Sequence, residues 1–220
     1  MSCDYCDERE GIETVYNKIY GDRNRVLCET EHFSIFPCMG QLREGHLLIV
    51  SKEHINAMGM LKKDILAELE SLVFRIGNLY ENLYQKNALC FEHGVLNDNG
   101  NNGGCGIYHM HLHLVPIRDG EFQAILSEVK NKNTNKIYLS QNLEDTCKCI
   151  TEKKTYVFLG LFDSGQKKES YIVNNSENYF ESQYIRKVVC RVFGKKEWDW
   201  KKIKCKERTF LRTLEKCNII

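Results

Sequence analysis

Residues 109–115 constrain the fold more strongly than any other part of this 220-residue chain, because they read His-Met-His-Leu-His-Leu-Val. On a β-strand alternate side chains share a face, so the three histidines lie on one face while Met110, Leu112 and Leu114 point into a core. Histidine rarely repeats in register by chance, which makes a surface strand with scattered histidines the less favoured interpretation. Three aligned imidazoles indicate a metal site or a nucleophilic centre, and the pattern alone leaves both open.

A glycine-rich loop, residues 97–106, leads directly into this strand. Without Cβ atoms in the way, its backbone N–H groups can approach an anion closely. A glycine-rich loop by itself is usually only a turn. Because this one leads into a histidine-lined strand, it suggests a phosphate held against a nucleophile.

The hydrophobic pattern predicts a mixture of short strands and helices. Short runs rich in Val, Ile, Leu and Phe are typical of strands, and apolar residues recurring every three or four positions are typical of helices. The predicted strands cover residues 25–29, 33–36, 46–51, 88–91, 107–117, 154–161 and 169–173. The predicted helices cover about 61–83, 182–193 and much of 201–216.

The histidines divide the chain into two parts. All seven lie before residue 126, at positions 32, 46, 54, 93, 109, 111 and 113. A site built on histidine therefore belongs to the first part. We predict a first domain over residues 1–125 and a smaller α/β extension over residues 126–220.

Composition excludes several classes of protein. The net charge of +1 argues against a whole-chain polyanion binder. No apolar run approaches the roughly 20 residues of a membrane-spanning helix, so no membrane role is expected. No secretory signal is visible, so the eleven cysteines are interpreted as reduced thiols or metal ligands of a cytoplasmic protein.

Cys3 and Cys6 form a CxxC pair, which is half of a zinc site. No second CxxC exists, so the remaining ligands would come from histidines of the first part, with His54 and His109 as candidates. The alternative is that both cysteines are free thiols.

Taken together, these motifs resemble the histidine triad superfamily. Residues 109–115 are similar to its His-φ-His-φ-His-φ-φ motif, and residues 45–54 resemble its G-H-x-L-V-I-P-K-x-H strand and turn. The resemblance covers roughly residues 3–118. A zinc-containing bacterial subgroup of predicted hydrolases with a C-terminal extension looks most similar, through residues 91–94 and 104–107. Galactose-1-phosphate uridylyltransferase is a more distant resemblance.

The resemblance implies an α+β fold, in which an antiparallel half-barrel sheet carries the long helix. It also implies transfer or hydrolysis at the α-phosphate of a nucleotide through a covalent nucleotidyl-histidine. His111 would be the nucleophile, and His113 would hold it through hydrogen bonds. The backbone amides of Gly104, Cys105 and Gly106 would stabilise charge on the phosphate oxygens.

The resemblance further implies a structural zinc site. Its ligands would be Cys3, Cys6, His54 and His109, which together would tie the N-terminus to the catalytic strand. A departure from the family pattern concerns ribose, because Cys38 stands where many members have an acidic residue. Ribose recognition by that route is therefore not expected.

Three further residues are candidate substrate contacts. His93 would contact a phosphate or leaving group, with a structural histidine as an equally favoured alternative. The C-terminal extension would cap the site through Gln183 and Arg186. Arg186 would clamp an anion, or else lie on a solvated helix face.

Several functional classes stay open. The favoured class is a hydrolase of dinucleoside polyphosphates or nucleotidyl conjugates, and the alternative is a nucleotidyltransferase or phosphorylase of the uridylyltransferase type. An intact third histidine favours hydrolysis. A nucleotide sensor is a third class. The basic, Trp-containing segment 184–212 leaves an enzyme acting on nucleotidylated nucleic-acid ends as a less favoured alternative. A monomer or a homodimer is expected.

Overall fold

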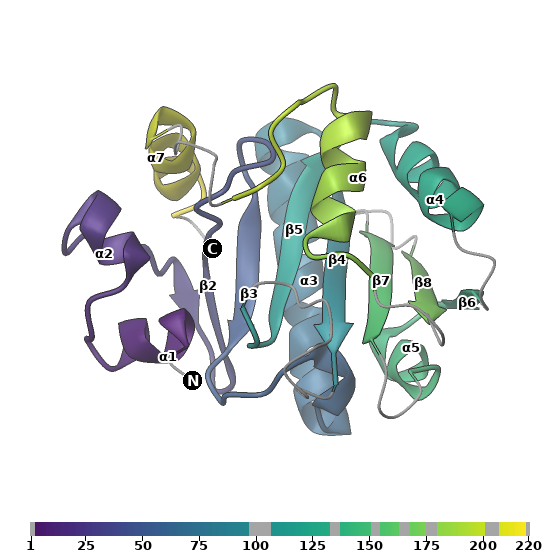
Figure 1. Cartoon of the computed structure of the whole chain (residues 1–220), viewed down its shortest axis with the longest axis horizontal. Helices are drawn as coiled ribbons and strands as arrows, with labels where there is room; N and C mark the ends of the chain where they lie inside the picture. The colour runs from purple at the N-terminus through teal and green to yellow at the C-terminus, as the bar shows by residue number, and fades with distance from the viewer. Residues whose placement is uncertain are drawn as a thin grey trace.

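The computed structural model describes residues 3–96, 107–132, 137–150, 155–162, 168–174, 180–200 and 207–218. Within these ranges the strands form one antiparallel sheet in the order β1-β2-β3-β5-β4-β7-β8-β6 (Figure 1). The strands are β1 (Cys28–Glu29), β2 (Phe33–Pro37), β3 (Leu47–Ser51), β4 (Asn87–Val95), β5 (His111–Ile117), β6 (Ile137–Ser140), β7 (Thr155–Phe162) and β8 (Lys168–Asn174). The predicted α+β class is confirmed.

Helices lie on both faces of the sheet and beside its β1 edge (Figure 1). The α-helices are α1 (Asp4–Arg9), α2 (Val15–Tyr20), α3 (Lys63–Tyr84), α4 (Glu121–Lys132), α5 (Leu143–Lys148), α6 (Tyr184–Val192) and α7 (Glu207–Lys216), and a short 3-10 helix, η1, covers Met58–Met60. In the part of the chain that is described, no helix is long and apolar enough to cross a membrane.

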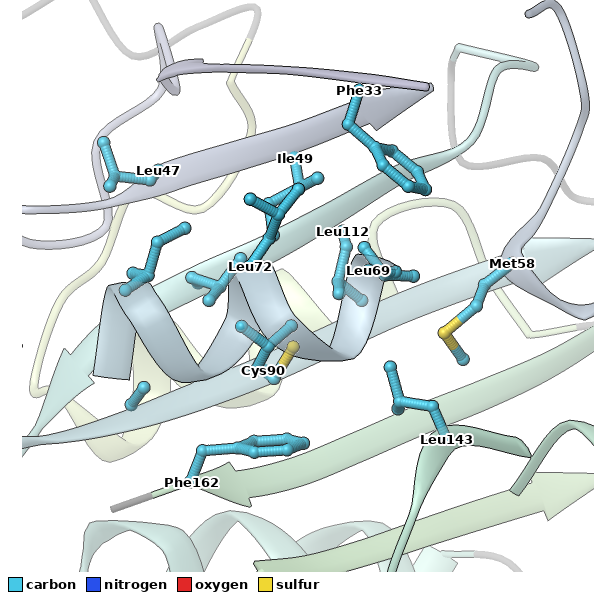
Figure 2. Packing of buried hydrophobic residues seen from close by; sticks show 14 of the residues in the cluster. Phe33, Leu47, Ile49, Met58, Leu69, Leu72, Cys90, Leu112, Leu143 and Phe162 are labelled. Carbon is cyan, nitrogen blue, oxygen red and sulfur yellow. The ribbon is translucent and has the colours of Figure 1, made fainter. Parts of the chain in front are cut away.

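The long helix α3 covers one face of the sheet. Its apolar residues recur at helical spacing, and Leu69, Val73, Ile76 and Tyr80 are fully buried. They pack against the inward side chains of the strands, and Figure 2 shows Leu69 and Leu72 facing the sheet beside Leu112. The expected helix over 61–83 is thereby confirmed, with its start two residues later.

The opposite face is covered by α4 and α6. Leu89, Val115 and Leu159 of the strands pack there against apolar residues of these two helices. This second core means that each central strand is buried on both faces, as the run of buried positions in β7 shows. A helix at α4 was not among the predicted elements.

The strand that carries the histidines is shorter than expected. We predicted a strand over residues 107–117, whereas β5 begins at His111. The reason is that the Met110 N–H donates to the Ile55 carbonyl, at 2.6 Å, instead of pairing with a neighbouring strand. His109 therefore precedes the strand, but the alternation extends to it, because Met110 lies in the same core as Leu112 and Leu114 and the Tyr5 ring contacts both His109 and His111. Leu112 and Leu114 do point into the core.

The C-terminal extension continues the sheet of the first part. β7 pairs with β4 over eight residue pairs, from Ala88–Phe162 to Val95–Thr155. The predicted boundary at residue 125 falls within α4. The strands of both parts thus share the core on each face of the sheet, and α6 lies over the face that carries His111 and His113.

Candidate active site and metal centre

A chain of hydrogen bonds orders the histidine side chains of the site. The Leu42 N–H donates to His46 Nδ1, at 3.2 Å, so the proton of this imidazole lies on Nε2. That Nε2–H donates to His113 Nδ1, at 2.9 Å, which leaves the His113 proton on its own Nε2. The tautomers are assigned from these partners. His113 is therefore held in one orientation, and it also stacks on Phe91 with ring centroids 4.5 Å apart.

His111 is oriented by the backbone. Its Nδ1–H donates to the carbonyl of His109, at 2.6 Å, which leaves a lone pair on Nε2. The His111 and His113 rings meet edge to face, with centroids 5.1 Å apart. Nε2 of His111 is thus the ring nitrogen that makes no bond to the backbone.

Burial keeps these imidazoles neutral. It lowers the pKa of His111 below its usual range; the bond to the His109 carbonyl opposes this shift and the Arg186 guanidinium adds to it. Burial also holds the pKa of both His46 and His113 well below 6.5. At neutral pH the group is therefore uncharged, and the His111 lone pair is available.

His111 and His113 line a pocket that is open to solvent. Its walls come from α1, the loop after β2, β4 and α6, and include Tyr5, Gly40, His93 and Arg186. His93 is only 9% exposed, and neither of its ring nitrogens has a hydrogen-bond partner among the described residues. Burial lowers its pKa to about 4. Buried polar atoms are rarely left unpaired, so this ring is suited to a ligand.

Arg186 brings a buried positive charge to the same pocket. The side chain is 5% exposed, and its guanidinium donates to the Gly40 carbonyl, at 2.7 Å, and to the Trp198 carbonyl, at 3.1 Å. No carboxylate of the described residues forms an ion pair with it. A buried guanidinium held by carbonyls still has N–H groups and charge to offer an anion.

Gln183 also lines the pocket, but its side-chain amide is already hydrogen-bonded to other residues of the chain. The amide N–H donates to Asp199, at 3.0 Å, and its oxygen accepts from the Trp200 N–H, at 3.2 Å. These bonds hold the segment after α6 against the helix start. Gly104, Cys105 and Gly106 lie outside the described residues.

Four predicted ligands come together at the N-terminus. Sγ of Cys3 and Sγ of Cys6 lie 3.3 Å and 3.6 Å from His109 Nδ1, and Sγ of Cys6 lies 3.2 Å from His54 Nδ1. All four ligand atoms lie within 4.8 Å of one another. In a tetrahedral zinc site with ordinary bond lengths, a sulfur and a nitrogen are about 3.5 Å apart. The donor set and spacing fit zinc.

His109 is held for this role by the neighbouring strand. Its Nε2–H donates to the Ser51 carbonyl, at 2.7 Å, so Nδ1 presents its lone pair to the cysteines. Burial lowers the pKa of His109 to about 4, which keeps the ring neutral. The bond to Ser51 is what directs Nδ1 of His109 toward the cysteines.

A second group, Cys38, His46 and His113, also brings three ligand atoms within 4.8 Å of one another. A metal on His46 Nε2 would require the proton to move to Nδ1. The Leu42 N–H already faces that Nδ1, so two donors would then oppose each other. This group is therefore a hydrogen-bond relay and not a metal site.

Sequence reasoning missed two residues of the site. His46 lies one residue before β3 and reaches His113 across the sheet; its position in the motif over 45–54 is the signal that could have marked it. Tyr5 lies between the two cysteines, and nothing in its sequence context distinguishes it from a linker residue.

The comparison with known families agrees with this geometry. The family model described as HIT domain matches residues 22–120. This stretch of the chain is therefore similar to the HIT domain family. The HIT domain thus contains His46, His54, His93 and the three histidines, while Cys3, Cys6 and Arg186 lie outside the matched residues.

Relatives of the HIT domain have modest sequence identity. An uncharacterized HIT-like protein of Methanocaldococcus jannaschii is 27% identical over 115 residues, which are 51% of this chain and 84% of the relative. The protein hit of Bacillus subtilis is 26% identical over 88 residues, 40% of this chain and 58% of the relative. A crystal structure of a HIT family protein from Bacillus anthracis has a TM-score of 0.40 and 17% identity, and the match covers 68% of this chain and 98% of that one.

Proposed function

We propose that this protein is a nucleotide hydrolase that cleaves at the α-phosphate of dinucleoside polyphosphates or nucleotidyl conjugates. One observation carries the proposal. The Nδ1–H of His111 is bound to the His109 carbonyl while its Nε2 lone pair belongs to a neutral ring that lines the pocket. This is the state that an imidazole nucleophile requires.

The reaction proceeds in two balanced steps. His111 Nε2 attacks the α-phosphorus, and a nitrogen–phosphorus bond forms as the bond to the leaving-group oxygen breaks. Water then attacks the same phosphorus, the nitrogen–phosphorus bond breaks, and the nucleoside monophosphate leaves with one proton released to solvent. The Nδ1–H bond to the backbone stabilises the positive ring of the intermediate.

The other pocket residues bind and orient the phosphates. The tautomer of His113 leaves its Nε2–H free to donate to a phosphate oxygen. The buried charge of Arg186 attracts the phosphate, and His93 supplies an unpaired ring nitrogen on the same wall of the pocket. These contacts favour a substrate with more than one anionic group.

Intact-mass analysis near neutral pH tests the proposal. The protein would be mixed with dinucleoside polyphosphates, nucleotide sugars and nucleoside phosphoramidates. We expect a nucleotidyl adduct on the wild type, none on His111→Ala, and an adduct retained on the control His32→Ala, a partly exposed histidine outside the pocket. Release by water alone supports a hydrolase, whereas release only with phosphate or a sugar phosphate supports a transferase. No adduct and no product across the panel would refute the proposal.

We also propose that Cys3, Cys6, His54 and His109 hold one structural zinc ion. The set fills four ligand positions, so no position stays open for a substrate. Zinc there would fix the N-terminal segment to the loop before β5. Native mass spectrometry and metal analysis should find one zinc per chain in the wild type and in Cys28→Ser, and none in Cys6→Ser. Equal zinc in Cys6→Ser would contradict the site.

A further inference from the structure

Helix α1 lies between two pockets and lines both of them. Its residues Asp4, Tyr5 and Glu8 line the pocket that contains His111. Tyr5, Glu8 and Arg9 also line a second hollow, on the side of β1 and α2. A displacement of this helix would therefore remove one wall of the pocket.

Apart from the ring of Tyr5, little packing holds α1 in place. The helix has six residues, none of them buried, and no side chain caps its start. A helix this short is not stable by itself in water, so its position depends on side-chain tethers. One tether is the ion pair of Glu8 with Arg25, at 2.8 and 2.5 Å, and another is the bond from Arg9 to the Lys52 carbonyl.

The strongest tether of α1 is the cysteine–histidine cluster, which consists of Cys3, Cys6, His54 and His109. Cys3 directly precedes α1 and Cys6 lies in its first turn, and both face His109. The cluster therefore sets the position of the residue between them in the first turn, Tyr5.

The Tyr5 ring packs directly beside the nucleophile. Its centroid lies 5.7 Å from that of His111, with an interplanar angle of 62°. It lies 5.6 Å from the His109 ring at 86° and 5.7 Å from the Phe36 ring at 56°. Such edge-to-face contacts restrict how a neighbouring ring can tilt, so the Tyr5 side chain is both a wall of the pocket and a brace for His111.

We infer that Tyr5 is a positioning residue for His111, and that a metal ion bound by the cysteine–histidine cluster fixes the position of Tyr5. Nucleotide binding therefore depends on the bound metal. The inference rests on the proposed function and on the proposed zinc ligands. It assigns the cluster a role in the pocket that reaches beyond stabilising the N-terminus. The coupling is mechanical, because no zinc ligand lines the pocket.

The test compares zinc-loaded full-length protein with His54→Ala, since His54 is a proposed ligand that lies outside the pocket. His32→Ala is the matched control. Three quantities would be measured: hydrogen exchange of residues 4–9, the side-chain nitrogen resonances of His111, and the affinity for nucleoside 5′-monophosphates by calorimetry. Circular dichroism would check that the sheet stays folded.

We expect His54→Ala to raise the exchange of residues 4–9, to shift the His111 resonances and to weaken nucleotide binding by roughly 2- to 10-fold. Tyr5→Ala should give the same shift and the same loss while keeping its zinc. Tyr5→Phe should restore both, because the ring and not the hydroxyl makes the contacts.

Three outcomes overturn the inference: unchanged exchange in zinc-free protein, increased exchange with unchanged His111 resonances, or a Tyr5→Ala variant that behaves as the wild type. If zinc-loaded wild type binds no nucleotide at all, the proposed function fails instead. The exchange and resonance measurements then still decide whether α1 positions His111.

Discussion

Single protons decide what each histidine of the site can do. The Leu42 N–H fixes the tautomer of His46, which in turn fixes that of His113. His111 takes its orientation from a backbone carbonyl and so does not depend on this relay. His111 and His113 are therefore ordered by two separate sets of hydrogen bonds.

Replacing His46 tests the relay. His46→Phe keeps a ring of similar size but removes the donor to His113 Nδ1, which leaves a buried acceptor without a partner. We expect kcat to fall by roughly tenfold with KM little changed, since the cost of an unpaired group is about 1–3 kcal/mol. The His113 nitrogen resonances should lose their single-tautomer signature. An unchanged kcat together with an unchanged spectrum would exclude the relay.

The pH profile of kcat/KM tests the charge state of His111. Its ring must be neutral to attack, and its pKa is lowered, so activity should persist below pH 6.5 and fall only as pH drops through that lowered value. Arg186→Gln removes a positive neighbour, which raises the His111 pKa and moves the acid limb to higher pH. Arg191→Gln, on the same helix but paired with Glu128 at the surface, should leave the limb in place. If the acid limb of the kcat/KM profile does not move in Arg186→Gln, the assignment of this limb to His111 is contradicted.

At the scale of elements, β5 serves two purposes at once. Its even-numbered residues Leu112 and Leu114 enter the core under α3, and its odd-numbered residues His111 and His113 face the pocket. Because the strand alternates, the burial of Leu112 and Leu114 sets the register that presents His111 and His113 to the pocket.

Leu112→Ala tests how much the core face of β5 contributes to stability. The side chain is fully buried in the core that Figure 2 shows, so its truncation should lower the free energy of unfolding by about 2–5 kcal/mol. Leu139→Ala in β6 makes the same change at a position that is 64% exposed, and should stay within about 0.5 kcal/mol of the wild type. Urea denaturation measures both. Equal losses in the two variants would be inconsistent with the core described here.

At the scale of the whole molecule, one sheet joins residues 1–125 and residues 126–220, which the sequence predicted as two separate parts. β4 lies inside the sheet, with the triad strand on one side and β7 of the extension on the other. α6 crosses the same region and carries Arg186, which reaches Gly40 across 146 residues of sequence. The pocket is therefore completed by the extension.

Truncation after residue 125 tests how independent the first part is. It would expose the edge of β4 and the apolar face that includes Leu89 and Phe91. An exposed apolar edge strand promotes aggregation, so we expect fragment 1–125 to be less soluble than residues 1–220, or partly unfolded. Size-exclusion chromatography and circular dichroism would measure this. A soluble fragment with native strand content would show that residues 1–125 fold as a separate domain.

The sequence was most informative where neighbouring residues decide the outcome. The stripe of α3, the strands around His111 and the inward direction of Leu112 follow from local periodicity, and the structure has all of them. The ligand set of Cys3, Cys6, His54 and His109 came from resemblance and not from periodicity. The structure brings these four together, which supports the proposed site.

Long-range contacts were decided by the tertiary structure alone. β5 begins at His111 because the Met110 N–H bonds the Ile55 carbonyl, and Tyr5 meets His111 because α1 is tethered beside β2 and β3. These contacts depend on packing and on hydrogen bonds between residues far apart in the chain, which no local pattern encodes. The sequence by itself therefore determined the elements and the chemistry of the histidine strand. The folded chain determined which histidine faces the metal ligands, which faces the pocket, and what surrounds it.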